Sequence, residues 1–110
     1  MPNSPDIAIV VPCYNEQKRL PIHDYRTFLE NHPKAKVCFV NDASTDHTGE
    51  VLQSLQNAFP KQVFILNNDR NMGKAEAVRN GVLFCNSEKL ASYTAYLDAD
   101  LATSLEECYG

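Results

Sequence analysis

The chain has 110 residues, which suffices for one domain, and its 44% hydrophobic and 22% charged residues are typical of a globular protein rather than a disordered one. The net charge of −4 argues against a nucleic-acid groove, which needs clustered lysine and arginine, and against a polybasic membrane patch. The longest apolar run, residues 7–11, is too short to span a bilayer, and no basic region precedes it as in a signal peptide.

Short apolar runs predict four β-strands, at residues 7–11, 37–40, 63–66 and 93–97. None of the runs alternates cleanly between apolar and polar residues, which is typical of strands covered on both faces in a parallel sheet. Their starts lie 30, 26 and 30 residues apart, the spacing of successive βα units.

Helical patterns fill the gaps between these strands, at residues 21–31, 48–58 and 74–86. We expect Asp46 or Thr48 to cap the second helix. A capping box at residues 103–106 predicts the start of a fourth helix. With right-handed crossovers, this order predicts an α/β protein with a Rossmann-like parallel sheet, one half of a doubly wound fold.

Four cysteines, Cys13, Cys38, Cys85 and Cys108, are far apart in sequence, so the chain has no CxxC zinc or redox motif. The first three lie in or beside apolar segments, as buried free thiols do. We expect all four to be reduced in a cytosolic protein, although a disulfide pair stays open as the alternative.

Polar segments follow every predicted strand, at residues 12–16, 41–46, 67–74 and 98–100. In parallel sheets ligands bind at the carboxyl ends of the strands, near the point where the strand order reverses. If these segments only connected strands to helices, turn-forming residues would suffice, whereas acidic, amide and small residues gather here. The convergence predicts a binding site.

Asp98-Ala99-Asp100 is the strongest chemical signal in the sequence. Two carboxylates at i and i+2 after a strand can face one pocket, and Mg²⁺ or Mn²⁺ prefers such oxygen ligands and often shares them with phosphates. The alternative is a solvated turn whose acidic residues cap a helix.

The segments after the first two strands suggest nucleoside contacts. Asp42 could accept a hydrogen bond from a ribose hydroxyl or a base N–H, Tyr14 could stack on a base, and Glu16 could accept from the nucleoside. The alternatives are a helix-capping turn around Asp42 and a proline-led loop, beginning at Pro12, with one half-exposed tyrosine.

Gly73 and Lys74 open the third helix, where a close backbone approach, a helix start and a positive charge favour an anion such as phosphate. The segment is not a Walker loop, and the chain has no GxGxxG or GxSxG motif, which argues against dinucleotide oxidoreductases and serine hydrolases.

Residues 11–16, 40–46, 71–74 and 98–100 together resemble, in order and spacing, the inverting glycosyltransferases of family 2, which have the GT-A fold. Finer features resemble dolichyl-phosphate glucosyltransferases and bacterial polyprenyl-phosphate relatives, in which a nucleoside-diphosphate sugar donates its sugar to a lipid phosphate. The resemblance implies a metal-dependent transferase and the strand order 3-2-1-4.

The resemblance also implies a role for each matching residue. Asp42 would bind the base, expected to be uracil, and Lys74 with Mg²⁺ or Mn²⁺ would stabilise the departing diphosphate. Asn41 stands where an aspartate is common, and Ala43 stands where a glycine is common, which implies a slightly different turn. The substrate-binding residues would be Pro12, Tyr14, Glu16, Asp42, Lys74, Asp98, Ala99 and Asp100, with Asp98 and Asp100 as metal ligands.

Family members are much longer, so residues 1–110 are expected to be the nucleotide-sugar-binding half of the catalytic domain, cut before the acceptor half. No catalytic residue is expected within this half, and we expect it to self-associate and to transfer no sugar. The donor would be UDP-glucose or GDP-mannose. The full protein would act at the cytoplasmic face of a membrane through its lipid-phosphate acceptor.

Three alternatives stay open. Another family 2 transferase would use a polysaccharide or glycolipid acceptor, and a non-catalytic nucleotide-binding module would have no acceptor at all. A nucleotidyltransferase of similar topology would need a glycine-rich, arginine-bearing loop after the first strand, which residues 12–16 lack.

Overall fold

The computed structural model describes residues 7–98, and within them the predicted alternation of strands and helices is confirmed. The predicted capping box, Ala99, Asp100 and Cys108 lie outside the described residues. The elements are β1 (Ile7–Cys13), α1 (Ile22–Asn31), β2 (Lys36–Asn41), α2 (Thr48–Ala58), β3 (Val63–Asn67), α3 (Lys74–Ser87) and β4 (Tyr93–Tyr96).

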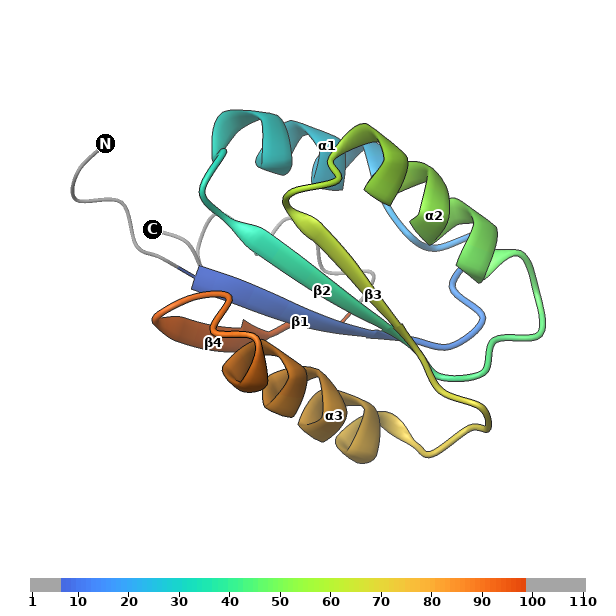
Figure 1. Cartoon of the computed structure of the whole chain (residues 1–110). Coiled ribbons are helices and arrows are strands. Elements are labelled where there is room, and N and C mark those ends of the chain that lie inside the picture. Colours follow the sequence, from blue (N-terminus) through green and yellow to red (C-terminus); the bar gives the residue numbers. More distant parts are fainter. Residues whose placement is uncertain (1–6, 99–110) are drawn as a thin grey trace.

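The four strands form one parallel sheet in the order β3-β2-β1-β4, which confirms the predicted order 3-2-1-4 (Figure 1). Cys13 is level with Asn41, and Asn41 is level with Asn67, so β1, β2 and β3 end side by side. Backbone bonds continue the pairing past the strand ends, since Asp42 N donates to Cys13 O at 2.8 Å and Asn68 N donates to Asn41 O at 2.9 Å. The three following loops therefore leave from the same edge.

Helices α1 and α2 cover one face of the sheet and α3 covers the other (Figure 1). Odd-numbered residues of β1, such as Ile9 and Val11, pack in the cluster under α1 and α2, whereas Ala8 and Val10 pack in the cluster under α3. Because side chains alternate across a strand, a central strand with helices on both faces needs apolar residues at nearly every position. This arrangement explains the absence of alternation in the sequence.

Gly81 lets α3 lie close to the sheet. A Cβ at this position would be 2.4 Å from Val10 Cγ1 and 3.0 Å from Val40 Cγ2, so any larger residue would push the helix outward. The position of Gly81 therefore helps to set the distance between α3 and the ends of the strands that it covers.

The start of α2 agrees only in part with the predicted caps, because Thr48 is the first residue of the helix rather than its cap. His47 directly precedes the helix, but Oδ1 of Asp46 accepts a hydrogen bond of 2.9 Å from the backbone N–H of Thr48. The Asp46 carboxylate therefore binds the first amide of α2, as predicted for a capping residue.

The three described cysteines, Cys13, Cys38 and Cys85, are free and buried, which confirms their expected packing role. Across residues 7–98 no helix has both the length and the apolar character needed to cross a membrane.

Candidate functional site

A cavity of about 550 Å³ opens at the carboxyl ends of the strands. It brings together all six of the predicted substrate-binding residues that the structure describes: Pro12, Tyr14, Glu16, Asp42, Lys74 and Asp98. Cys13, Arg19, Asn71, Gly73 and Ala77 complete its lining. The predicted convergence of polar segments is thus present in the fold.

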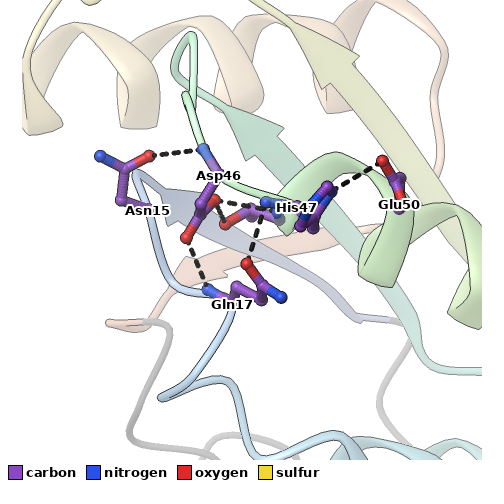
Figure 2. Close-up of polar contacts among 6 residues, drawn as sticks. Asn15, Gln17, Asp46, His47 and Glu50 are labelled. Carbon is purple, nitrogen blue, oxygen red and sulfur yellow. Dashed lines mark hydrogen bonds and ion pairs between the residues drawn. The ribbon is translucent and has the colours of Figure 1, made fainter.

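The loops after β1 and β2 are tied together by their own side chains (Figure 2). Oδ1 of Asn15 accepts hydrogen bonds from the backbone N–H of Thr45 at 2.7 Å and of Asp46 at 3.3 Å. The Gln17 side chain likewise accepts from the backbone N–H of His47 at 3.1 Å. In the other direction, the backbone N–H of Gln17 donates to Asp46 Oδ2 at 3.3 Å. Each loop thus holds the backbone of the other.

Sequence reasoning assigned no role to Asn15, although it holds the segment that carries Tyr14 and Glu16. Its φ is 52°, in the left-handed region, and its own backbone N–H donates to Ser44 Oγ at 3.0 Å. Asparagine is one of the few residues that tolerates this conformation. The sequence signal that could have indicated this role was an asparagine between two candidate ligand residues.

Glu16 and Tyr14 present different chemistry to the cavity. The side chain of Glu16 is only 15% exposed, and its Oε1 lies 3.1 Å from Arg19 Nη2, while its backbone N–H donates to Thr48 Oγ1 at 2.9 Å. Tyr14 is 44% exposed, so its ring is open to a flat partner. Arg19 also lines the cavity, and its guanidinium partly neutralises the Glu16 carboxylate.

Asp42 is 3% exposed, and its carboxylate contacts the loop after β3. Oδ1 accepts hydrogen bonds from Asn68 Nδ2 at 2.8 Å and from the backbone N–H of Met72 at 2.9 Å, and Oδ2 accepts from the backbone N–H of Gly73 at 3.0 Å. A buried charge is costly unless it is hydrogen-bonded, and these three donors meet that requirement. A role for Asp42 at a nucleobase stays a prediction.

The neighbouring residues Asn41 and Ala43 shape the same turn. Asn41 is buried, accepts a hydrogen bond from the backbone N–H of Ser44 at 3.2 Å and donates to Asn67 Oδ1 at 3.3 Å. Ala43 has a φ of 60°, in the left-handed region that favours glycine. The alanine therefore occupies a conformation that its Cβ disfavours.

Lys74 and Asp98 form an ion pair across the cavity, from the first residue of α3 to the segment after β4. Their side chains are 58% and 43% exposed, so the pair is accessible to solvent. An exposed pair of this kind contributes roughly 0–1 kcal/mol. It can therefore exchange its partners when a more highly charged group enters.

Within the described part of the chain, no cluster of three histidine, cysteine, aspartate or glutamate residues forms a metal site. Of the predicted metal pair, only Asp98 lies within the described residues, whereas Asp100 lies outside them, as does Ala99. Asp98 offers one carboxylate of the kind that Mg²⁺ or Mn²⁺ prefers, and the predicted metal pair stays a prediction.

Cys13 lines the cavity but is unsuited to nucleophilic chemistry. Burial, together with the charge of Glu16, raises the pKa of its thiol far above the ordinary range, and its Sγ donates to Val11 O at 3.7 Å. The thiolate is the reactive form of cysteine, and it is suppressed here.

The model of the family named Glycosyl transferase family 2 matches residues 8–109. The match spans nearly the whole chain, so the chain belongs to this family.

Curated relatives of the chain include dolichyl-phosphate beta-glucosyltransferases. The chain is 34% identical over 114 residues to a dolichyl-phosphate beta-glucosyltransferase of Trichomonas vaginalis, covering 96% of this chain and 34% of the relative. It is 36% identical over 110 residues to the dolichyl-phosphate beta-glucosyltransferase of Mus musculus, covering 92% and 33% respectively. The chain thus spans about a third of the length of the relatives it matches.

Among solved structures, the chain resembles a mannosyltransferase of Pyrobaculum calidifontis in complex with GDP-Man and Mn²⁺, with a TM-score of 0.68 and 21% identity. This likeness covers 94% of the chain and 32% of the mannosyltransferase. The fold is therefore that of the GT-A nucleotide-sugar transferases, as the resemblance implied.

Proposed function

We propose that the chain forms the donor-binding part of an inverting glycosyltransferase that moves a sugar from a nucleoside diphosphate to a polyprenyl or dolichyl phosphate. The observation that carries the proposal is the cavity at the strand ends, which combines an exposed aromatic ring, acceptors and a lysine ammonium. The names of the two relatives support dolichyl phosphate as acceptor and glucose as the sugar, with mannose as the second candidate.

In this proposal the nucleoside occupies the end of the cavity formed by the loops after β1 and β2. Tyr14 stacks on the base, and Glu16 accepts a hydrogen bond from the nucleoside. Asp42 can still accept from a base N–H, because Oδ2 receives one hydrogen bond in the structure and a carboxylate oxygen can accept two.

The diphosphate then lies toward the start of α3. Lys74 is the first residue of this helix, so its ammonium and the helix N-terminus both favour an anion at this end of the cavity. The side chains of Asp98 and Asp100 would hold Mg²⁺ or Mn²⁺, which when bound supplies further positive charge for the diphosphate.

The acceptor phosphate is already ionised, so it can attack the anomeric carbon directly and invert it without a strong general base. Negative charge develops on the departing diphosphate, where the Lys74 ammonium stabilises it. Because the acceptor is a lipid, we place the reaction of the whole protein at a membrane surface, at its cytoplasmic face.

Isothermal titration of the 110-residue chain with UDP-glucose and GDP-mannose, each with Mn²⁺ and with EDTA, tests the proposal. We expect one of the two donors to bind, and to bind more tightly with Mn²⁺. The variant Tyr14→Ala should weaken this binding, whereas Tyr93→Ala, at an exposed position on β4, should leave it unchanged. Absence of binding by both donors in a folded chain would refute the proposal.

A further inference from the structure

We propose that Asp42 is a positioning residue that sets the place of the Lys74 ammonium by holding the loop in front of α3. The inference rests on the proposed function of the cavity, and it gives Asp42 a role at the diphosphate end of the donor. Asp42 itself lies at the end of β2, whereas Lys74 begins α3 on the other side of the loop.

One carboxylate binds two successive backbone amides of that loop. Oδ1 accepts from the N–H of Met72 at 2.9 Å and Oδ2 accepts from the N–H of Gly73 at 3.0 Å. Hydrogen bonds from backbone N–H groups to an ionised carboxylate are about twice as strong as neutral ones. Gly73 is joined directly to Lys74, so the two bonds fix the point from which the lysine side chain departs.

The same residue also holds the beginning of the loop. The side chain of Asn68 donates to Asp42 Oδ1 at 2.8 Å, and the side chain of Asn71 donates to the backbone oxygen of Asp42 at 3.4 Å. Asp42 thus contacts residues at both ends of the segment 68–73. Loss of the carboxylate would weaken three contacts at once, those from Asn68, Met72 and Gly73.

The backbone conformation of Gly73 depends on its hydrogen bond to the Asp42 carboxylate. Its φ of 90° and ψ of 158° lie in a region that side chains rarely adopt, and the loop keeps this conformation while its amide points at the carboxylate. Without the carboxylate, glycine has many other conformations available, and Lys74 would lose its fixed starting point.

The substitution Asp42→Asn tests the role at nearly constant volume. An amide has one oxygen instead of two, so it can no longer accept from the N–H groups of Met72 and Gly73 through separate oxygens. Asp69→Asn is the matched control, since Asp69 is exposed on the same loop and the charge change is identical.

Two titrations of each 110-residue variant, one with uridine and one with UDP, separate the two ends of the donor; guanosine and GDP replace them if GDP-mannose is the preferred sugar. For Asp42→Asn we expect UDP to bind about tenfold more weakly, the scale of a lost charge-assisted contact. Uridine should change less than about twofold, because the amide keeps one oxygen that can accept from a base N–H. Equal losses for uridine and UDP, or no loss for UDP, would overturn the proposal.

A double-mutant cycle with Lys74→Ala tests whether Asp42 acts through Lys74. If it does, Asp42→Asn has no further effect on UDP affinity once Lys74 is alanine, whereas additive losses would contradict the proposal. If Asp42→Asn does not fold, Asn68→Ala removes only one donor to the same carboxylate. It should then weaken UDP binding about twofold to threefold without changing uridine binding.

Hydrogen exchange of the Met72 and Gly73 amides, measured by NMR without nucleotide, supplies a readout that does not depend on donor binding. Both amides should exchange at least about tenfold faster in Asp42→Asn than in Asp69→Asn. Unchanged exchange would refute the positioning role even if the chain binds UDP. If the chain binds no donor, the proposed function fails, while this measurement still decides whether Asp42 orders the loop.

Discussion

The side-chain oxygen of Asn15 accepts a hydrogen bond of 2.7 Å from the backbone N–H of Thr45, which lies 30 residues further along the chain. Asn15 follows β1 and Thr45 follows β2, so this contact makes two separate loops into one unit. Tyr14 and Glu16, on either side of Asn15, depend on that unit for their positions.

Replacement of Asn15 should destabilise the fold by two separable effects. Asn15→Ala removes the bonds to Thr45 and Asp46 and also places a Cβ-bearing aliphatic residue at a φ of 52°. We expect the free energy of unfolding to fall by about 2–3 kcal/mol in urea titrations followed by circular dichroism. Asn15→Gly removes the bonds without the backbone strain and should cost about 1 kcal/mol less than the alanine variant; equal losses would show that strain is unimportant.

Ala43→Gly should stabilise the protein. A left-handed φ of 60° costs an alanine roughly 1–2 kcal/mol. The greater freedom of glycine in the unfolded chain costs only about 0.4–1 kcal/mol. The net gain should be about 0.5–1 kcal/mol in the free energy of unfolding. The control Ala75→Gly lies within α3 and should destabilise by up to about 1 kcal/mol; a destabilised Ala43→Gly variant would contradict the strain argument.

Gly81→Ala should destabilise the protein by about 1–3 kcal/mol, the usual cost of overpacking a filled core. The added Cβ would lie 2.4 Å from Val10 Cγ1, and α3 would have to move away from the sheet. Leu83→Ala, at a position that is 51% exposed on the same helix, should change stability by less than about 0.5 kcal/mol. Thermal unfolding of both variants compares them directly, and similar values would rule out the close approach at Gly81.

Donor binding should depend on a divalent cation through Asp98. UDP-glucose, or GDP-mannose if that donor is preferred, should bind more tightly with Mn²⁺ than with EDTA. Asp98→Ala should abolish this difference, because the carboxylate that now pairs with Lys74 is removed. Asp24→Ala, which removes an exposed carboxylate from α1, should preserve it. Equal affinities with Mn²⁺ and EDTA in the unaltered chain would refute metal-linked binding.

His47 should titrate above its usual value of 6.5, because its Nδ1 lies 2.9 Å from Glu50 Oε1 and this hydrogen bond raises the pKa (Figure 2). The contribution to stability is complete below pH 6.5 and is lost as pH rises through the higher pKa of the folded protein. Glu50→Gln should lower the His47 pKa, as measured by NMR titration of the imidazole, whereas Glu30→Gln on α1 should not. An unchanged pKa in Glu50→Gln would show that the contact does not persist in solution.

The sequence alone determined the order of elements, the strand-end location of the cavity and the family. The apolar runs are continuous because the sheet is covered on both faces, and the carboxyl ends of parallel strands must meet at one edge. The sequence therefore predicted that five side chains line one cavity: Tyr14, Glu16, Asp42, Lys74 and Asp98.

Only the tertiary structure decided which of these side chains contact one another. The amides that bind Asp42 lie 30 and 31 residues away, and those that bind Asn15 lie 30 and 31 residues away. Such contacts depend on the register of β1, β2 and β3 and on where each loop turns, and local residue preferences encode neither. For this reason the sequence pointed to Asp42 as a ligand residue, and only the fold brought its carboxylate to the loop that carries Lys74.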